Sequence, residues 1–130
     1  RKRREFFSGE GLSPSEWIIR NKGIVRKLRH PDGKVYEQRI SFEDFARIVD
    51  GIKPLAPPNN KPFHTSDWLK AVGWDKKQRY KLNVAAVVLQ DKKALKISGK
   101  IRSASYEVIV SAEDLDQIVQ EITSAPESSA

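Results

Sequence analysis

A chain of 130 residues can form one domain, or two small units that share one core. No apolar run approaches the roughly 18 residues of a membrane-spanning helix, so we expect no membrane contact. The sequence has no cysteine, which excludes disulfides, cysteine-ligated metal sites and a thiol nucleophile. It also lacks an HExxH motif and a glycine-rich phosphate loop, so we expect no enzyme, no metal and no cofactor.

The net charge of +7 is unevenly distributed along the chain. Residues 1–69 have a net charge of +5, residues 70–102 have +8, and residues 103–130, which contain no lysine or arginine, have −6. Cations that meet phosphates release condensed counterions, so the middle segment favours a polyanionic partner. A solvated, lysine-rich surface is the alternative interpretation. Because the chain starts at Arg1 and contains no methionine, we expect a domain excised from a larger protein.

The N-terminal part of the chain predicts a flexible basic arm at 1–12 and then a first unit at 13–53. This unit begins with SPSE at residues 13–16, a pattern typical of a helix start. We therefore expect a short helix that docks through Trp17 and the two isoleucines after it.

The rest of the first unit predicts a β-hairpin followed by a second helix. Strands are expected at 24–30 and 34–40, because the Pro-Asp-Gly run at 31–33 supplies a turn between them. A helix is expected at 42–51, since Ser41 is a good N-cap and the apolar residues after it recur at helical spacing.

A second unit is predicted at 65–122, after a proline-rich linker at 54–64. Its first helix starts at Thr65 or Ser66 and ends at Gly73.

Residues 76–90 allow two interpretations. Apolar residues recur at helical spacing, but the same letters also alternate as in a strand. The length of the segment favours a helix, which we expect.

The remainder of the second unit predicts two strands and a last helix. Apolar residues alternate with basic ones over 95–102, and a second strand returns at 106–110. Ser111 then caps a helix that ends near Ile122, and residues 123–130 are small and polar, which predicts a disordered tail.

Two segments that lie 70 residues apart have similar sequences. YEQRISFEDFARIVDGI at 36–52 and YEVIVSAEDLDQIVQEI at 106–122 are identical at eight of 17 positions. Capping chemistry alone selects part of this pattern, so convergence is the alternative to duplication. Duplication predicts an α+β fold of two related helix–β-hairpin–helix units that share one core.

The order helix, turn, helix and basic two-stranded wing over residues 66–110 resembles a winged-helix DNA-binding module. The resemblance implies that the first turn of the 76–90 helix enters the major groove, while the wing contacts phosphates. If 76–90 is a strand instead, the two halves resemble duplicated single-strand-binding folds of the Whirly type, with Trp74 and Tyr80 stacking on bases. The residues that we expect to bind nucleic acid are Lys76, Lys77, Arg79, Lys81, Asn83, Lys92, Lys93, Lys96, Lys100 and Arg102.

These observations predict a non-catalytic DNA-binding domain that prefers double strands and works inside the cell, in the nucleus if the organism is a eukaryote. A protein-interaction or scaffold domain is the alternative, with the acidic C-terminal helix as the docking element. The carboxylate pairs at 43–44 and 113–114 do not require a catalytic role, because both stand in the first turn of a predicted helix and complement its dipole.

Overall fold

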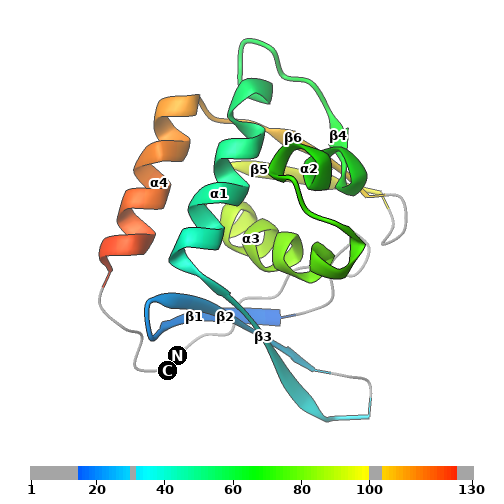
Figure 1. Ribbon diagram of the computed structural model, residues 1–130, viewed down its shortest axis with the longest axis vertical. Helices are drawn as coiled ribbons and strands as arrows, with labels where there is room; N and C mark the ends of the chain where they lie inside the picture. The colour runs from blue at the N-terminus through cyan, green and yellow to red at the C-terminus, as the bar shows by residue number, and fades with distance from the viewer. Residues whose placement is uncertain (1–14, 30–31, 100–103, 126–130) are drawn as a thin grey trace.

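The computed structural model describes residues 15–29, 32–99 and 104–125 (Figure 1). These residues form an α+β fold with four α-helices and two three-stranded antiparallel sheets. The predicted basic arm at 1–12 lies outside the described residues, as does the tail from residue 126 onward.

The first sheet has the order β1-β2-β3 and is built from consecutive strands. Its strands are β1 (Ser15–Arg20), β2 (Gly23–Arg29) and β3 (Val35–Ser41). Strands β2 and β3 confirm the predicted hairpin. Asp32 holds the turn between them, because its carboxylate Oδ1 accepts a hydrogen bond of 2.9 Å from the Lys34 backbone N–H.

The predicted helix at the start of the first unit is wrong, because residues 15–20 form strand β1. A tight turn at Asn21 and Lys22, with φ angles of 51° and 56°, folds β1 back onto β2. This left-handed pair matches the twist of a hairpin. Tryptophan and isoleucine at 17–19 favour a strand, and pairing with β2 outweighs the local helix-start signal.

The four helices are α1 (Phe42–Ile52), α2 (Thr65–Val72), α3 (Arg79–Asp91) and α4 (Ala112–Ser124). Each confirms a predicted helix, and the strand alternative for 76–90 is wrong. The N-cap of α2 is His64, one residue before the expected cap, and its backbone N–H donates to Asp67 at 2.9 Å. Helix α4 includes Thr123 and Ser124, so this start of the predicted disordered tail is ordered.

The second sheet is small and has the order β4-β6-β5. Its strands are β4 (Phe63–His64), β5 (Leu95–Ser98) and β6 (Ser105–Val108). β4 comes from the end of the predicted linker, which also forms the short 3₁₀ helix η2 (Lys53–Leu55). Strands β5 and β6 correspond to the predicted wing. However, β6 also pairs with β4 on its other side, so this hairpin belongs to a three-stranded sheet rather than standing alone.

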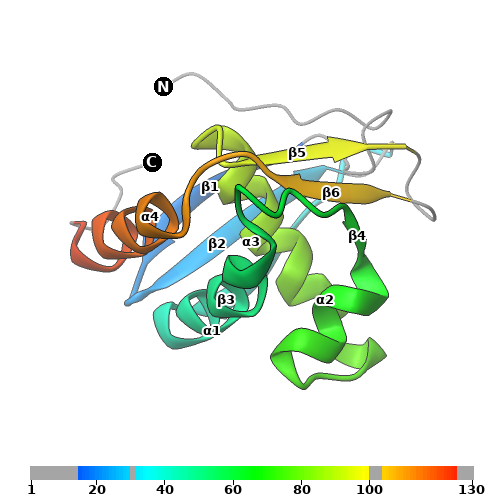
Figure 2. The same cartoon turned by 90° about the horizontal axis from the view of Figure 1, so that it is seen from above.

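Helix α3 is the centre of the core. It contacts all three strands of the first sheet, and it also contacts α1, α2 and β5 (Figures 1 and 2). Leu82 and all six residues from Val84 to Leu89 are buried. A helix that is apolar on all sides is suited to the interior of a domain. The exposed residues of α3, Arg79 and Tyr80, both lie in its first turn, which limits any groove contact to that turn.

The two similar segments adopt the same local structure. Each forms a strand, a serine N-cap and a helix: β3 leads to α1, and β6 leads to α4. Ser41 accepts a hydrogen bond from the Asp44 backbone N–H at 3.0 Å, and Ser111 accepts one from Asp114 at 3.1 Å. However, β3 is an edge strand and β6 is a central strand, and the first segment is preceded by no helix among the described residues.

Candidate nucleic-acid interface

Residues 73–81, which we call the α2–α3 corner, place a run of cations at the surface. Gly73 ends α2 in the left-handed region, with a φ of 89°, which glycine adopts without steric cost. Asp75 then caps the 3₁₀ helix η3 (Lys76–Gln78) by accepting a hydrogen bond of 2.9 Å from the Lys77 backbone N–H. This turn joins directly to α3, so the side chains of η3 and the first turn of α3 project from one short segment.

Trp74 forms an aromatic centre of this corner. Its ring is half-buried and lies under two cations, with Lys81 Nζ at 5.0 Å and Arg47 Cζ at 5.8 Å from the ring centroid. Cation–π attraction favours these positions. Lys81 is also paired with Asp44 on α1 at 3.2 Å, so α1 and α3 meet electrostatically at Trp74.

Three further cations of the corner are exposed. Lys76, Lys77 and Arg79 have no ion pair among the residues that the structure describes. Tyr80, beside them, is 38% exposed. The corner therefore combines unneutralised cations with an accessible aromatic ring, which is the combination that binds phosphates and unstacked bases.

Arg79 also lies near a polar cluster inside the fold. Burial raises the pKa of the Tyr106 phenol, whereas its hydrogen bond to Thr65, 3.3 Å long, and the charges of Arg79 and Arg26 oppose this rise. Arg26 on β2 is itself buried, and this desolvation lowers its pKa to about 10. The start of α3 is thus close to the middle of the first sheet.

The predicted basic block is divided between the two ends of α3. Lys76, Lys77 and Arg79 precede or begin the helix, whereas Lys92 and Lys93 follow its last residue. With 13 residues and a rise of 1.5 Å per residue, the helix separates the two groups by about 20 Å. The structure therefore does not bring the predicted site residues together in one cluster.

The other predicted site residues contribute less to a basic surface. Lys81 is ion-paired and half-buried, and Asn83 is half-buried in the first turn of α3. Lys96 is exposed on β5, but its cross-strand partner on β6 is Glu107, which reduces the charge of that face. Lys100 and Arg102 lie outside the described residues.

Sequence reasoning missed Arg47, which joins the corner from α1. Its exposed position on a helix gave no signal, because only the tertiary contact of α1 with α2 and α3 places it at Trp74. Trp74 had been considered for base stacking only in the strand interpretation of 76–90. The structure places it at the surface turn before a helix instead.

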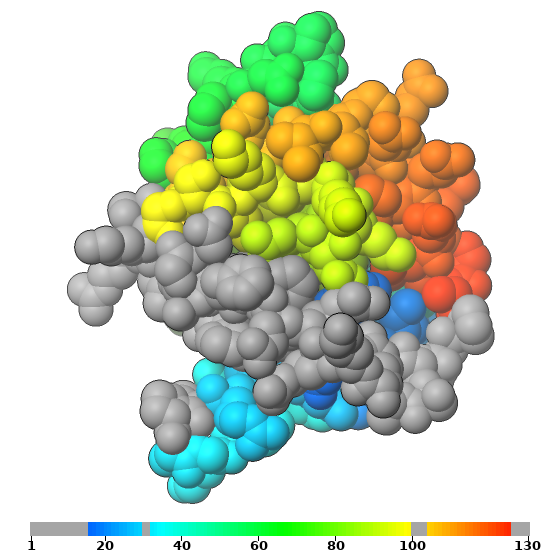
Figure 3. Space-filling model, turned by 180° about the vertical axis from the view of Figure 1, so that it is seen from behind, coloured from blue at the N-terminus to red at the C-terminus, as the bar shows by residue number. Residues whose placement is uncertain are grey.

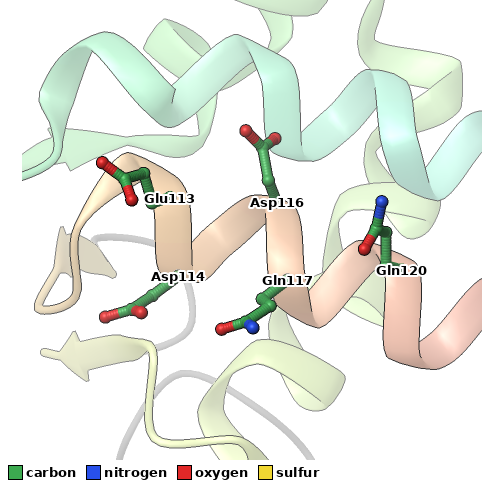
Figure 4. Close-up of a pocket in the computed structure, with 5 residues that line it drawn as sticks. All are labelled: Glu113, Asp114, Asp116, Gln117 and Gln120. Carbon is green, nitrogen blue, oxygen red and sulfur yellow. The ribbon is translucent and has the colours of Figure 1, made fainter.

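Helix α4 carries the acidic surface on the opposite side of the molecule from the corner. In Figures 1 and 2 α4 lies at the left, whereas the α2–α3 corner lies at the right. An open hollow of about 300 Å³ lies on α4, and Figure 4 shows the side chains around it. It is lined by Glu113, Asp114, Asp116, Gln117 and Gln120. All five residues come from one helix, so the hollow is the surface of α4 rather than an enclosed binding cavity.

One lysine reaches the acidic helix from η2, directly after α1. Lys53 Nζ contacts the carboxylates of Asp116 on α4 and of Asp50, the latter at 2.8 Å. These hydrogen bonds, first to Asp116 and then to Asp50, raise the pKa of Lys53 above its usual value of 10.5. Among the described residues, the cations of the corner form no ion pair with α4.

Within the described ranges, no helix is long and apolar enough to cross a membrane. The same residues contain no group of three His, Asp or Glu side chains placed to hold a metal ion. Comparisons of the chain with protein-family models, with curated proteins and with solved structures find no match.

Proposed function

We propose that this chain is a non-catalytic DNA-binding domain that contacts duplex DNA through the α2–α3 corner. The observation that carries the proposal is the exposure of Lys76, Lys77 and Arg79 in one short turn, without carboxylate partners among the described residues. The acidic helix α4 lies on the opposite side of the molecule, so its carboxylates do not cancel the positive electrostatic field of the corner.

The chemistry of the corner suits a polyanion. Lysines contact phosphates as point charges, and the Arg79 guanidinium can bond two acceptors at once, either on a phosphate or on a guanine edge. The N-terminal end of α3 adds the positive end of a helix dipole. Because α3 is buried beyond its first turn, we infer that phosphate contacts supply most of the affinity and that base contacts come from Arg79 alone.

The finer assignment as a winged-helix-like module belongs to this proposal. It is supported by the order of α2, α3 and the β5–β6 hairpin along the chain. In this arrangement the wing contributes Lys96, with Lys100 and Arg102 following it in the sequence. In a eukaryotic cell such a domain would act in the nucleus.

Salt dependence is the first test of the proposal. We expect the chain to bind a fluorescently labelled 20-base-pair duplex with a log–log salt slope of about −3 or steeper, because each phosphate contact contributes about −0.9. Fluorescence anisotropy between 50 and 300 mM NaCl measures it. The same strand without its complement tests the preference for duplex. No measurable binding at 50 mM NaCl would contradict the proposal.

A pair of matched triple variants tests the location. Replacing Lys76, Lys77 and Arg79 by alanine should weaken duplex binding at least tenfold and reduce the salt slope by about 2.7, the value for three lost contacts. The control replaces Lys61, Lys92 and Lys93 by alanine, which removes the same charge from exposed positions outside the corner and the wing. Equal losses in the two variants would show attraction by net charge rather than binding at the corner.

A protein-interaction domain is the second candidate, and the exposed carboxylates of α4 favour it. Helix α4 has Glu113, Asp114, Asp116 and Glu121 exposed, and the helix contains no lysine or arginine. This candidate predicts no duplex binding at moderate salt. If the chain binds DNA as proposed, replacing the exposed glutamates of α4 by glutamine and its exposed aspartates by asparagine should leave the affinity for duplex DNA unchanged or raise it.

A further inference from the structure

The hairpin formed by β2 and β3 stands out from the body of the molecule. Figure 1 shows it projecting below α3, and Figure 3 shows residues of β3 and the turn as a knob at the lower left. Val35 is 53% exposed and Tyr36 is 39% exposed, and Arg29 and Lys34 beside them are also exposed. Such exposed apolar residues at the end of a hairpin do not serve the core.

The charges on this hairpin are unbalanced, because residues 23–29 and 32–41 contain five lysines and arginines but only two acidic side chains. Asp32 holds the turn by accepting from the Lys34 backbone N–H, and Glu37 pairs with Arg20 of β1 at 3.3 Å. Two exposed arginines of the hairpin donate to backbone oxygens: Arg29 donates to Gly33 O at 3.4 Å, and Arg39 to Asn21 O at 2.7 Å. A backbone carbonyl does not neutralise a guanidinium, so Arg29, Lys34 and Arg39 retain their positive charge.

The hairpin and the α2–α3 corner lie on the same side of the molecule. In Figure 1 the end of the hairpin lies at the lower right and the corner lies above it at the right, so both are away from the acidic α4. Contacts of α3 with β2 and β3 fix the hairpin relative to α3.

We propose that the β2–β3 hairpin is a second DNA contact, a two-stranded ribbon that binds a groove of the same duplex. This inference rests on the proposed function of the corner. A two-stranded ribbon has the width that the major groove accepts. Arg29 and Lys34, at the end of the hairpin, contact the phosphates, and the exposed side chain of Val35, the cross-strand partner of Arg29, contacts the apolar surfaces of the bases and sugars from the same face of the ribbon.

The test compares Arg29→Ala/Lys34→Ala with Lys92→Ala/Lys93→Ala, a control with the same charge change at exposed positions. The hairpin variant should bind the labelled 20-base-pair duplex at least fivefold more weakly at 100 mM NaCl and show a salt slope smaller by about 1.8. The control should change affinity less than twofold. Because Arg29 bonds to the turn, Lys34→Glu provides a second variant that keeps this bond, and it should also weaken binding at least fivefold.

Hydroxyl-radical footprinting measures which nucleotides the protein protects, and a change in net charge alone does not shift this pattern of protection. The hairpin variant should lose protection at one group of nucleotides, and the corner triple variant should lose it at another group. Unchanged affinity and footprint in both hairpin variants, with a weakened corner variant, would overturn the ribbon and leave the corner intact. A wild-type chain that fails to bind at 50 mM NaCl would overturn both proposals together.

Discussion

The two similar segments show how one local sequence pattern serves two different positions in a fold. In both, a strand leads to a serine that caps a helix: Ser41 is the last residue of β3, whereas Ser111 follows the end of β6 by three residues. The backbone angles at the two serines agree within a few degrees: φ −77° and ψ 163° at Ser41 against φ −71° and ψ 163° at Ser111. Their surroundings differ. α1 packs against α2, α3 and α4, whereas the main contacts of α4 are with α1 and η2.

The different packing of α1 and α4 is explained by the positions at which the two segments have different residues. Gly51 of α1 lies where a Cβ would come within 3.1 Å of the Val72 side chain of α2, so glycine permits the close approach of these helices. The equivalent residue of α4 is Glu121, which is exposed. The local pattern therefore determines the helix and its cap, and the variable positions determine which faces become core and which become a charged surface.

Truncating the equivalent isoleucines of α1 and α4 should give the largest difference in the free energy of unfolding between the two helices. Ile48 of α1 is fully buried, whereas Ile118 of α4 is 9% exposed at the rim of the core. We expect Ile48→Ala to lower the free energy of unfolding by about 4 kcal/mol and Ile118→Ala by about 2 kcal/mol, because a less enclosed site leaves a smaller cavity. Urea unfolding measures both. Equal losses would mean that α4 is as central to the core as α1.

Removing the two serine caps should give a smaller effect, and an equal one. Ser41→Ala and Ser111→Ala each leave a first-turn N–H without its side-chain acceptor, which costs about 1 kcal/mol. Ser41→Asp and Ser111→Asp are the controls, because aspartate also accepts this bond. Thermal and urea unfolding compare the four variants. A difference above about 1 kcal/mol between the two alanine variants would show that the caps are not equivalent.

Much of the secondary structure could be predicted from the sequence, because caps and turns act locally. Ser41, Ser111 and Gly73 mark helix ends through hydrogen bonds and backbone angles that involve only neighbouring residues. Strand β1 was not predicted, because the local sequence at residues 13–16 indicates a helix start, whereas the strand is stabilised by non-local pairing with β2. The turn at Asn21 and Lys22 lacks the glycine that usually reveals such a hairpin.

The candidate site was harder to predict, because it depends on the orientation of rigid elements. The sequence groups Lys76 with Lys93, but the buried α3 holds them at opposite ends. Conversely, Arg47 and Trp74 are distant in the chain and meet only through the packing of α1 against α2 and α3. A charge count along the sequence carries no information on either arrangement.

The smallest expected effect concerns Lys53, which links the two similar helices electrostatically. It bonds to Asp50 of α1 and Asp116 of α4, and the equivalent position in the second segment is Thr123 in the last turn of α4, which has no charge. Because these bonds raise the pKa of Lys53, its contribution is fully present below the unfolded pKa near 10.5 and is lost as the pH rises through the higher folded value.

Lys53→Met should therefore lower the free energy of unfolding by less than about 1 kcal/mol at pH 8, as expected for a partly exposed ion pair. The gap between variant and wild type should close between about pH 10 and pH 12, where the lysine loses its proton. Lys61→Met is the control, because Lys61 is exposed and has no ion pair among the described residues. A gap that persists at pH 12 would assign the effect of Lys53 to the packing of its methylene chain rather than to its charge.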